Sequence, residues 1–220
     1  MTIEIPAESF AQRIAAEPVL VDPNRVAAFG ACLADLTRHE HFQDFMQPAA
    51  INDDGFWPTP GDWMARYRPY NVIDGVLQIP VMGALINRMG YQIGRYATGY
   101  SYIERAFERG LADSMVKGIA FVIDSPGGEA AGNFELVDKL YAGRGQKPMA
   151  AFVADMAFSG GYSIATAAPT INITRSGATG SVGVVTMHVD VSEALSQAGI
   201  KVTFIKAGAH KVDGNSYEPL

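Results

Sequence analysis

The sequence predicts an α/β fold built around a mainly parallel β-sheet, and two observations carry this prediction. From Val72 onward, short apolar runs of strand length alternate with segments of helical periodicity, which is the pattern of βαβ crossovers. The run from Ile119 to Ile123 is continuously apolar, as expected for a strand buried on both faces of a parallel sheet. With 220 residues, of which 48% are hydrophobic, the chain is long enough to bury one substantial core.

Residues 1–70 differ in texture from the rest and are predicted to form a helical extension followed by an irregular linker. Asp22 and Pro23 form a helix start signal, with a capping side chain before a proline at the first helical position. Apolar residues then recur at helical spacing, at Val26, Phe29, Leu33 and Leu36. Between residues 39 and 70, prolines and turn-forming residues interrupt the periodicity. We therefore divide the chain into an extension, residues 1–70, and a globular domain, residues 71–220.

The elements of the second part follow in order. Asp74 and Gly75 separate two apolar runs and predict a hairpin. Residues 90–99 form a loop rich in glycine and tyrosine, and Ser101 with Glu104 predicts a capping box that opens a helix. Further helices are expected over residues 129–141, from about 159 to before 169, and over 191–198, and further strands over 149–153, 171–174, 182–187 and 201–205.

Charge and cysteine content restrict the kind of protein this can be. The formal net charge is −6, and no run of Lys or Arg is longer than a pair, which argues against a surface for nucleic acid or anionic membrane. The single cysteine, Cys32, cannot form an internal disulfide. The N-terminus carries acids where a signal peptide carries bases, and no apolar stretch approaches the ~20 residues that span a bilayer. We therefore expect a soluble cytoplasmic protein that is not secreted.

Two glycine-containing turns follow predicted strands. The first is Asp124–Gly128, and the second is Ser159–Gly161 at the start of a predicted helix. In open α/β sheets, ligands bind beyond the carboxyl ends of the strands, and backbone amides in such turns can bind an anion. The two turns can therefore form an oxyanion hole beside a serine nucleophile. For the first turn, the alternative is a plain loop that ends a strand.

A serine nucleophile needs a general base. His210 adjoins Lys211, so a Ser/His arrangement stays open, although no Gly-x-Ser-x-Gly motif accompanies it. A lysine can act as the base only where burial lowers the lysine pKa. Lys211 follows a predicted strand within a loop bounded by glycines, where a long side chain can turn back into a cleft; otherwise it is an ordinary surface lysine.

Four motifs resemble the signature segments of the S49 peptidases. They are Asp124–Gly128, Phe158–Tyr162, Thr179–Val184 and Gly208–Gly214, in the order of that family. Ser181 follows Ser159 by 22 residues and Lys211 follows it by 52, separations similar to those between the family's nucleophile, lysine-orienting serine and general-base lysine. The resemblance implies that Ser159 is the nucleophile, Lys211 the general base and Ser181 the hydroxyl that holds the lysine.

The same resemblance implies the rest of the site and the fold. The amides of Gly128 and Gly160 would form the oxyanion hole, and Gly127, Phe158 and Gly161 would contact substrate. No metal or organic cofactor is needed. The implied fold is ClpP/crotonase-like, with repeated ββα units, and the implied assembly is a homo-oligomer. Many members have a smaller residue where this chain has Phe158, so we expect a reshaped pocket beside the nucleophile.

The segment Gly208–Tyr217 resembles the phage branch of the family, the capsid maturation proteases of lambda-like phages. That branch implies a prohead protease that cleaves scaffold and capsid proteins, in the host cytoplasm or the prohead, with no nucleic-acid or membrane partner. Family members continue through further helices, so the domain is expected to lack C-terminal helices after Leu220.

Three alternatives to the phage protease stay open. One is a soluble bacterial signal-peptide-peptidase-like protease with the same chemistry. The others belong to different classes: a crotonase-like acyl-CoA enzyme and a non-catalytic capsid-associated protein.

Overall fold

The computed structural model describes residues 12, 14, 18–46, 53–184 and 188–219. The chain forms two compact units, Met1–Val185 and Thr186–Leu220, and each is described by itself. The domain boundary near residue 70 stays a prediction.

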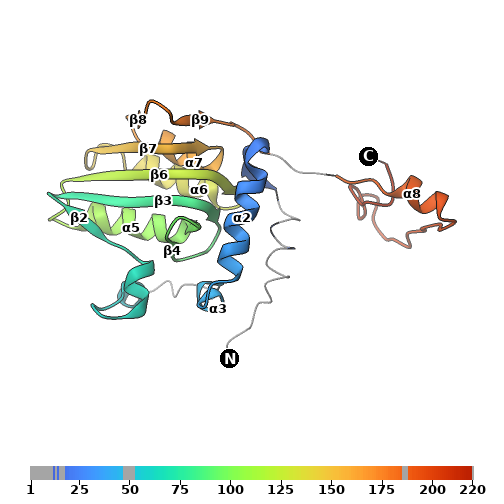
Figure 1. Cartoon of the computed structure of the whole chain (residues 1–220), viewed down its shortest axis with the longest axis horizontal. Coiled ribbons are helices and arrows are strands. Elements are labelled where there is room, and N and C mark those ends of the chain that lie inside the picture. Colours follow the sequence, from blue (N-terminus) through green and yellow to red (C-terminus); the bar gives the residue numbers. More distant parts are fainter. Residues whose placement is uncertain (1–11, 13, 15–17, 47–52, 185–187, 220) are drawn as a thin grey trace. The chain divides into compact units, whose positions relative to one another are not determined.

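The first unit is built around a mixed β-sheet whose central strands run parallel (Figure 1). The central strands are β3 (Val76–Ile86), β6 (Gly118–Glu129), β7 (Met149–Phe158) and β8 (Ile171–Ile173), side by side in that order. On the other side of β3, β5 (Ala97–Gly99) pairs in parallel with it, and β4 (Gln92–Ile93) pairs antiparallel with β5. This arrangement confirms the predicted fold class and is consistent with a ClpP/crotonase-like fold.

Three short strands pair with parts of the central strands. They are β1 (Val19–Val21) on β6, β2 (Asn71–Ile73) on β3 and β9 (Ala178–Gly180) on β7. The hairpin between β2 and β3 confirms the predicted turn, since Asp74 and Gly75 take the positive φ angles of 52° and 82° that suit a two-residue hairpin loop.

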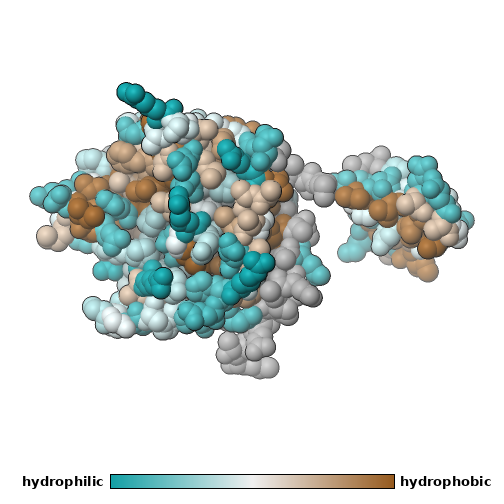
Figure 2. Space-filling model, viewed as in Figure 1, coloured by the Kyte–Doolittle hydropathy of each residue, from teal (hydrophilic) through white to brown (hydrophobic). Residues whose placement is uncertain are grey.

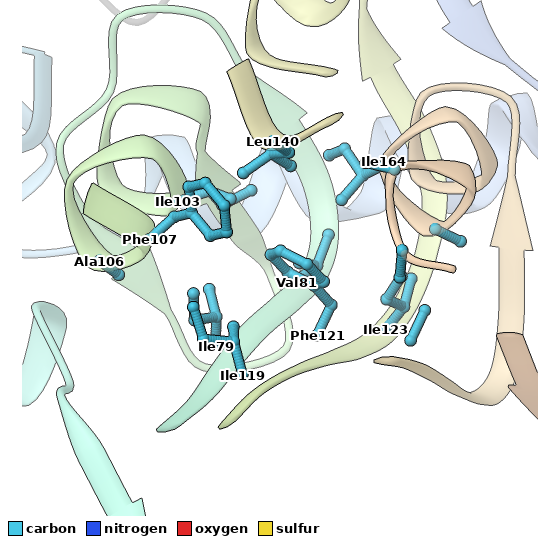
Figure 3. Packing of buried hydrophobic residues seen from close by; sticks show 14 of the residues in the cluster. Ile79, Val81, Ile103, Ala106, Phe107, Ile119, Phe121, Ile123, Leu140 and Ile164 are labelled. Carbon is cyan, nitrogen blue, oxygen red and sulfur yellow. The ribbon is translucent and has the colours of Figure 1, made fainter. Parts of the chain in front are cut away.

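Helices α5 (Tyr100–Ala112), α6 (Asn133–Ala142) and α7 (Gly160–Ala167) pack against the sheet and form the main core with it (Figure 3). Alternate residues of the strands enter this core, because successive side chains of a strand point to opposite faces. The labelled core residues are Ile79, Val81, Ile103, Ala106, Phe107, Ile119, Phe121, Ile123, Leu140 and Ile164.

The N-terminal segment packs at the carboxyl end of the central strands. Asp22 accepts a hydrogen bond from the Asn24 amide and caps a 3₁₀ turn, η1 (Pro23–Arg25), which leads into α2 (Val26–Thr37). This confirms the predicted helix. Helix α2 contacts β3 and β6 and crosses the end of the sheet in Figure 1. Phe29 and Leu36 lie in a second buried cluster with Ala84 and Ile86 of β3.

The predicted linker contains short helices of its own. They are α3 (Phe42–Met46), α4 (Asp53–Phe56) and the 3₁₀ helix η2 (Trp63–Tyr67). None of the helices in the described ranges has the length and apolar character needed to cross a bilayer.

Some expected elements differ in the structure. The predicted capping box is wrong, because α5 begins at Tyr100 with Gly99 as its N-cap, so Ser101 already lies in the first turn. The predicted loop over residues 90–99 contains β4 and β5. Residues 182–184 form no strand, and residues 185–187 of the same prediction lie outside the described residues.

The second unit, residues 186–220, has α8 (Ser192–Gln197), which confirms the predicted helix, but the strand expected over residues 201–205 is not formed. A strand requires a neighbour to bind its amides and carbonyls, and no other strand lies within residues 188–219. No residue in that described range is buried, and Ile200 and Ile205 are exposed. Figure 2 shows such hydrophobic surface on this unit.

Replacing Phe121 tests the main core. Its side chain is fully buried between the sheet and the helices, so Phe121→Ala is expected to lower the free energy of unfolding by about 3–5 kcal/mol, measured by urea denaturation. Phe152→Ala on neighbouring β7 is the matched control, because Phe152 is 46% exposed. Equal losses in the two variants would contradict this assignment of the core.

Candidate active site

Ser159 lies at the junction of a strand and a helix, between the end of β7 and the start of α7. Its backbone angles are φ 48° and ψ −110°, a conformation that costs a non-glycine residue about 1–3 kcal/mol. The Ser159 amide donates to the Gly180 carbonyl at 2.8 Å, and its carbonyl accepts from the Ser163 amide at 2.9 Å. These bonds hold the serine in its strained position.

The segment Thr179–Val184, the third of the four motifs, lies against Ser159. The Ser159 hydroxyl donates to the Gly183 carbonyl at 3.2 Å, while Gly180 binds its amide. Ser181 lies between these two glycines and has a positive φ of 55°. The structure therefore brings Ser159 together with the loop that carries Ser181.

The two glycine turns meet beside the serine. The Gly128 amide nitrogen lies 3.5 Å from the point that a Cβ on Gly160 would occupy. A Cβ on Gly128 would overlap the backbone carbonyl of Leu85 on β3, so this position accepts only glycine. The predicted oxyanion donors, Gly128 and Gly160, are thus neighbours in space.

Ser125 holds the first turn in shape. It is fully buried, its hydroxyl donates to the Gly83 carbonyl at 2.7 Å, and it accepts from the Gly127 amide at 3.1 Å. A Cβ on Gly161 would lie 3.2 Å from the Ser125 side chain, so α7 packs closely on this turn. Sequence reasoning placed Ser125 in a motif but missed this role.

Asn133, at the start of α6, connects the helices around the site. Its amide group donates to the Tyr100 hydroxyl at 3.1 Å and to the Gly160 carbonyl at 3.3 Å, and accepts from the Ser163 hydroxyl at 2.5 Å. Tyr100 in turn donates to the Glu129 carbonyl at 2.7 Å. Burial raises the pKa of Tyr100 far above its usual value, so the phenol stays a neutral donor.

Sequence reasoning missed this buried network as well. Asparagine is common where a helix begins, and nothing in the local pattern distinguishes Asn133 from such a residue. The contacts that define it come from α5 and α7, far away in the chain.

Phe158, the last residue of β7, is partly exposed. The Arg25 guanidinium lies 5.5 Å from the centre of its ring. The N-terminal segment therefore reaches the residue next to Ser159.

Lys211 and His210 belong to the second unit, and both are exposed there. His210 is paired with Asp213, with Nδ1 2.8 Å from the carboxylate. Since the two units are described separately, the roles predicted for Lys211 and for the open His210 alternative stay predictions. Among the described residues, no cluster of three or more His, Cys, Asp or Glu side chains is arranged to hold a metal ion.

Replacing Asn133 tests the network around Gly160. Asn133→Ala removes one hydrogen-bond partner each from the Gly160 carbonyl and the Tyr100 and Ser163 hydroxyls. We therefore expect the free energy of unfolding to fall by about 1–3 kcal/mol, measured by thermal and urea denaturation. Asn24→Ala, at an exposed position, is the control and should change little. An Asn133 variant as stable as the control would rule out the network.

Comparison with known proteins identifies sequences that are similar to this chain. Residues 142–220 match peptidase family S49. The head-tail preconnector protein GP5 of Enterobacteria phage P21 is 36% identical over 211 residues, which cover 93% of this chain and 42% of that protein. The capsid assembly protease C of Escherichia phage lambda is 32% identical over 210 residues, covering 93% of this chain and 48% of that protein.

A further relative is cellular. The putative protease MJ0651 of Methanocaldococcus jannaschii is 32% identical over 108 residues, covering 49% of this chain and 35% of that protein. The chain spans less than half the length of either phage relative. The matched region contains Ser159 and the glycine turn after it, and residues 142–220 of this chain are therefore similar to peptidase family S49.

Proposed function

We propose that this chain is the peptidase part of a phage prohead protease, a serine endopeptidase that processes scaffold and capsid proteins during head maturation. The observation that carries the proposal is Ser159, a buried and strained serine at a strand-to-helix junction, whose neighbour Gly160 lies beside the Gly128 amide. Similarity to two phage proteins over 93% of the chain supports the phage assignment, and one of the two is named a capsid assembly protease.

The proposed mechanism uses a Ser/Lys dyad. The neutral amine of Lys211 takes the proton of the Ser159 hydroxyl, and the oxygen attacks a peptide carbonyl. The amides of Gly128 and Gly160 bind the oxyanion that forms. Lys211 then returns the proton to the leaving amine, and water hydrolyses the acyl-enzyme with the same base. Ser181 holds the lysine, and no metal or organic cofactor takes part.

Substrate contacts and assembly complete the proposal. Gly127, Phe158 and Gly161 contact the substrate beside the nucleophile. The chain acts as a homo-oligomer in the phage prohead or host cytoplasm. The exposed apolar residues of the second unit support association with another surface.

Active-site labelling tests the dyad. A serine-reactive fluorophosphonate is expected to label the full chain at Ser159, and Ser159→Ala should abolish labelling. Lys211→Ala should slow labelling at least about a hundredfold, because removing a general base typically costs this much. The rate is followed by gel fluorescence between pH 7 and 9, and the labelled residue is identified by mass spectrometry.

Three further variants complete the labelling experiment. Ser181→Ala should slow acylation without abolishing it. Lys206→Ala and Ser176→Ala are the controls, since both residues are exposed, and they should label like the wild type. Labelling that survives Ser159→Ala would contradict the assignment of Ser159 as the nucleophile. A Lys211→Ala variant labelled as fast as the wild type would contradict the assignment of Lys211 as the base.

Co-expression tests the substrate class. A phage scaffold protein produced together with the chain is expected to be cleaved into discrete fragments, and Ser159→Ala should prevent this cleavage. Short apolar peptides serve as the comparison, because a signal-peptide-degrading enzyme would prefer them. Efficient cleavage of these peptides with an intact scaffold would contradict the prohead assignment.

A further inference from the structure

The short strand β1 lies on the edge of β6 next to the candidate site. Strand β6 pairs with β7 as far as Ser125 opposite Ala157, and beyond this point β1 takes the free edge. The pairing is antiparallel, with Leu20 opposite Gly128. Two more hydrogen bonds extend it at either end, from the Ala130 amide to the Pro18 carbonyl at 3.1 Å and from the Asp22 amide to the Pro126 carbonyl at 3.4 Å.

This register directs the Gly128 amide toward β1. In an antiparallel pair, hydrogen-bonded and non-bonded residue pairs alternate. The bonded pairs at the two ends each lie two positions from the Leu20 and Gly128 pair, so that pair is bonded as well. The Leu20 carbonyl therefore accepts from the Gly128 amide, the same amide that lies beside Gly160.

The strand is anchored by its side chains. Leu20 and Val21 are 4% and 3% exposed. Val21 lies in the second buried cluster, with Val19 packed against it, and Leu20 points to the opposite side because side chains alternate along a strand. Side chains on both faces of β1 are therefore buried, and these contacts hold the strand on the edge of β6.

An extended peptide commonly binds a protein by adding a strand to a free sheet edge. The edge at Gly127–Glu129 offers such a place beside Ser159, but β1 already uses its hydrogen bonds. Ser159 is itself only 4% exposed, although a nucleophile must reach its substrate. The described site is therefore closed to an incoming peptide.

We propose that residues 18–22 are a built-in inhibitory strand, which occupies the peptide-binding edge of β6 with the Leu20 carbonyl on the Gly128 amide. The strand must leave before a substrate peptide can bind. This inference rests on the proposed function, because it names what regulates the same site.

The residues that pair β1 with β6 favour release of β1 from the sheet. Pro18 and Pro126 have no amide hydrogen, so each outer pair makes one hydrogen bond where two are normal. Strand β1 is three residues long, and such short elements open locally at less free energy than a core strand such as β6.

Leu20→Pro in the full chain tests the strand. The substitution removes the Leu20 amide hydrogen and its buried side chain, so β1 should detach. We expect the fluorophosphonate labelling rate to rise at least about fivefold. Amide hydrogen exchange of residues 128–130, measured by mass spectrometry, should quicken by a similar factor, while residues 119–123 stay protected. Ile205→Pro, at a fully exposed position in the second unit, is the matched control and should change neither measurement.

A second measurement uses the unmodified chain and does not depend on the variant folding. The amides of Gly128 and Ala130 should exchange more slowly than in an unfolded peptide of the same sequence, because they donate to the Leu20 and Pro18 carbonyls. A synthetic peptide with the sequence of residues 18–22 should slow the labelling of Leu20→Pro and restore protection.

The outcomes separate the two proposals. A folded Leu20→Pro variant that is labelled at the wild-type rate would overturn the inhibitory strand alone. Unprotected amides at Gly128 and Ala130 in the unmodified chain would do the same. If no variant is labelled while exchange responds as expected, the proposed peptidase function fails, and the inhibitory role fails with it.

Discussion

The pairing of β6 with β3 on one edge and β7 on the other is the constraint on which the structure depends. It buries Phe121 and Ile123 under the helices, and it carries the carboxyl end of β6 to the point where β7 turns into α7. Where β3 and β6 pair, Gly128 lies so close to the Leu85 carbonyl that a Cβ at this position would overlap it. Gly128, one of the two predicted oxyanion donors, therefore lies where the sheet requires a glycine.

Around this junction, buried polar groups replace the apolar packing of the core. Ser125 binds the backbone of Gly83 and Gly127, and Asn133 binds Tyr100, Ser163 and the Gly160 carbonyl. Buried polar groups are costly unless they are all satisfied, so such a network specifies one backbone arrangement. This is the rigidity that a strained serine needs, because its conformation persists only where its surroundings hold it.

Much of the fold could be predicted from local pattern. The apolar run at Ile119–Ile123, the turn at Asp74–Gly75 and the helix start at Asp22 each carry their signal in a few neighbouring residues. The strands expected over residues 182–187 and 201–205 have equally strong local signals, yet residues 182–184 and 201–205 are not strands. A strand depends on a partner, and pairing is not a local property. The capping box at Ser101 failed for a related reason, since β5 runs directly into α5 and moves the helix start to Tyr100.

The sequence by itself determined the α/β class, the two glycine turns and the serine between strand and helix, because short-range periodicity and turn chemistry specify these features. Its family resemblance named Lys211 and Ser181 as partners of Ser159, and those roles are still proposals. Only the tertiary structure decided that Asn133 and Ser125 hold the site, and that β1 lies on the edge of β6 beside Gly128. Residues 20 and 128 are far apart in the chain. Their pairing depends on backbone hydrogen bonds, which are common to all residue types and therefore cannot be predicted from the local side-chain pattern.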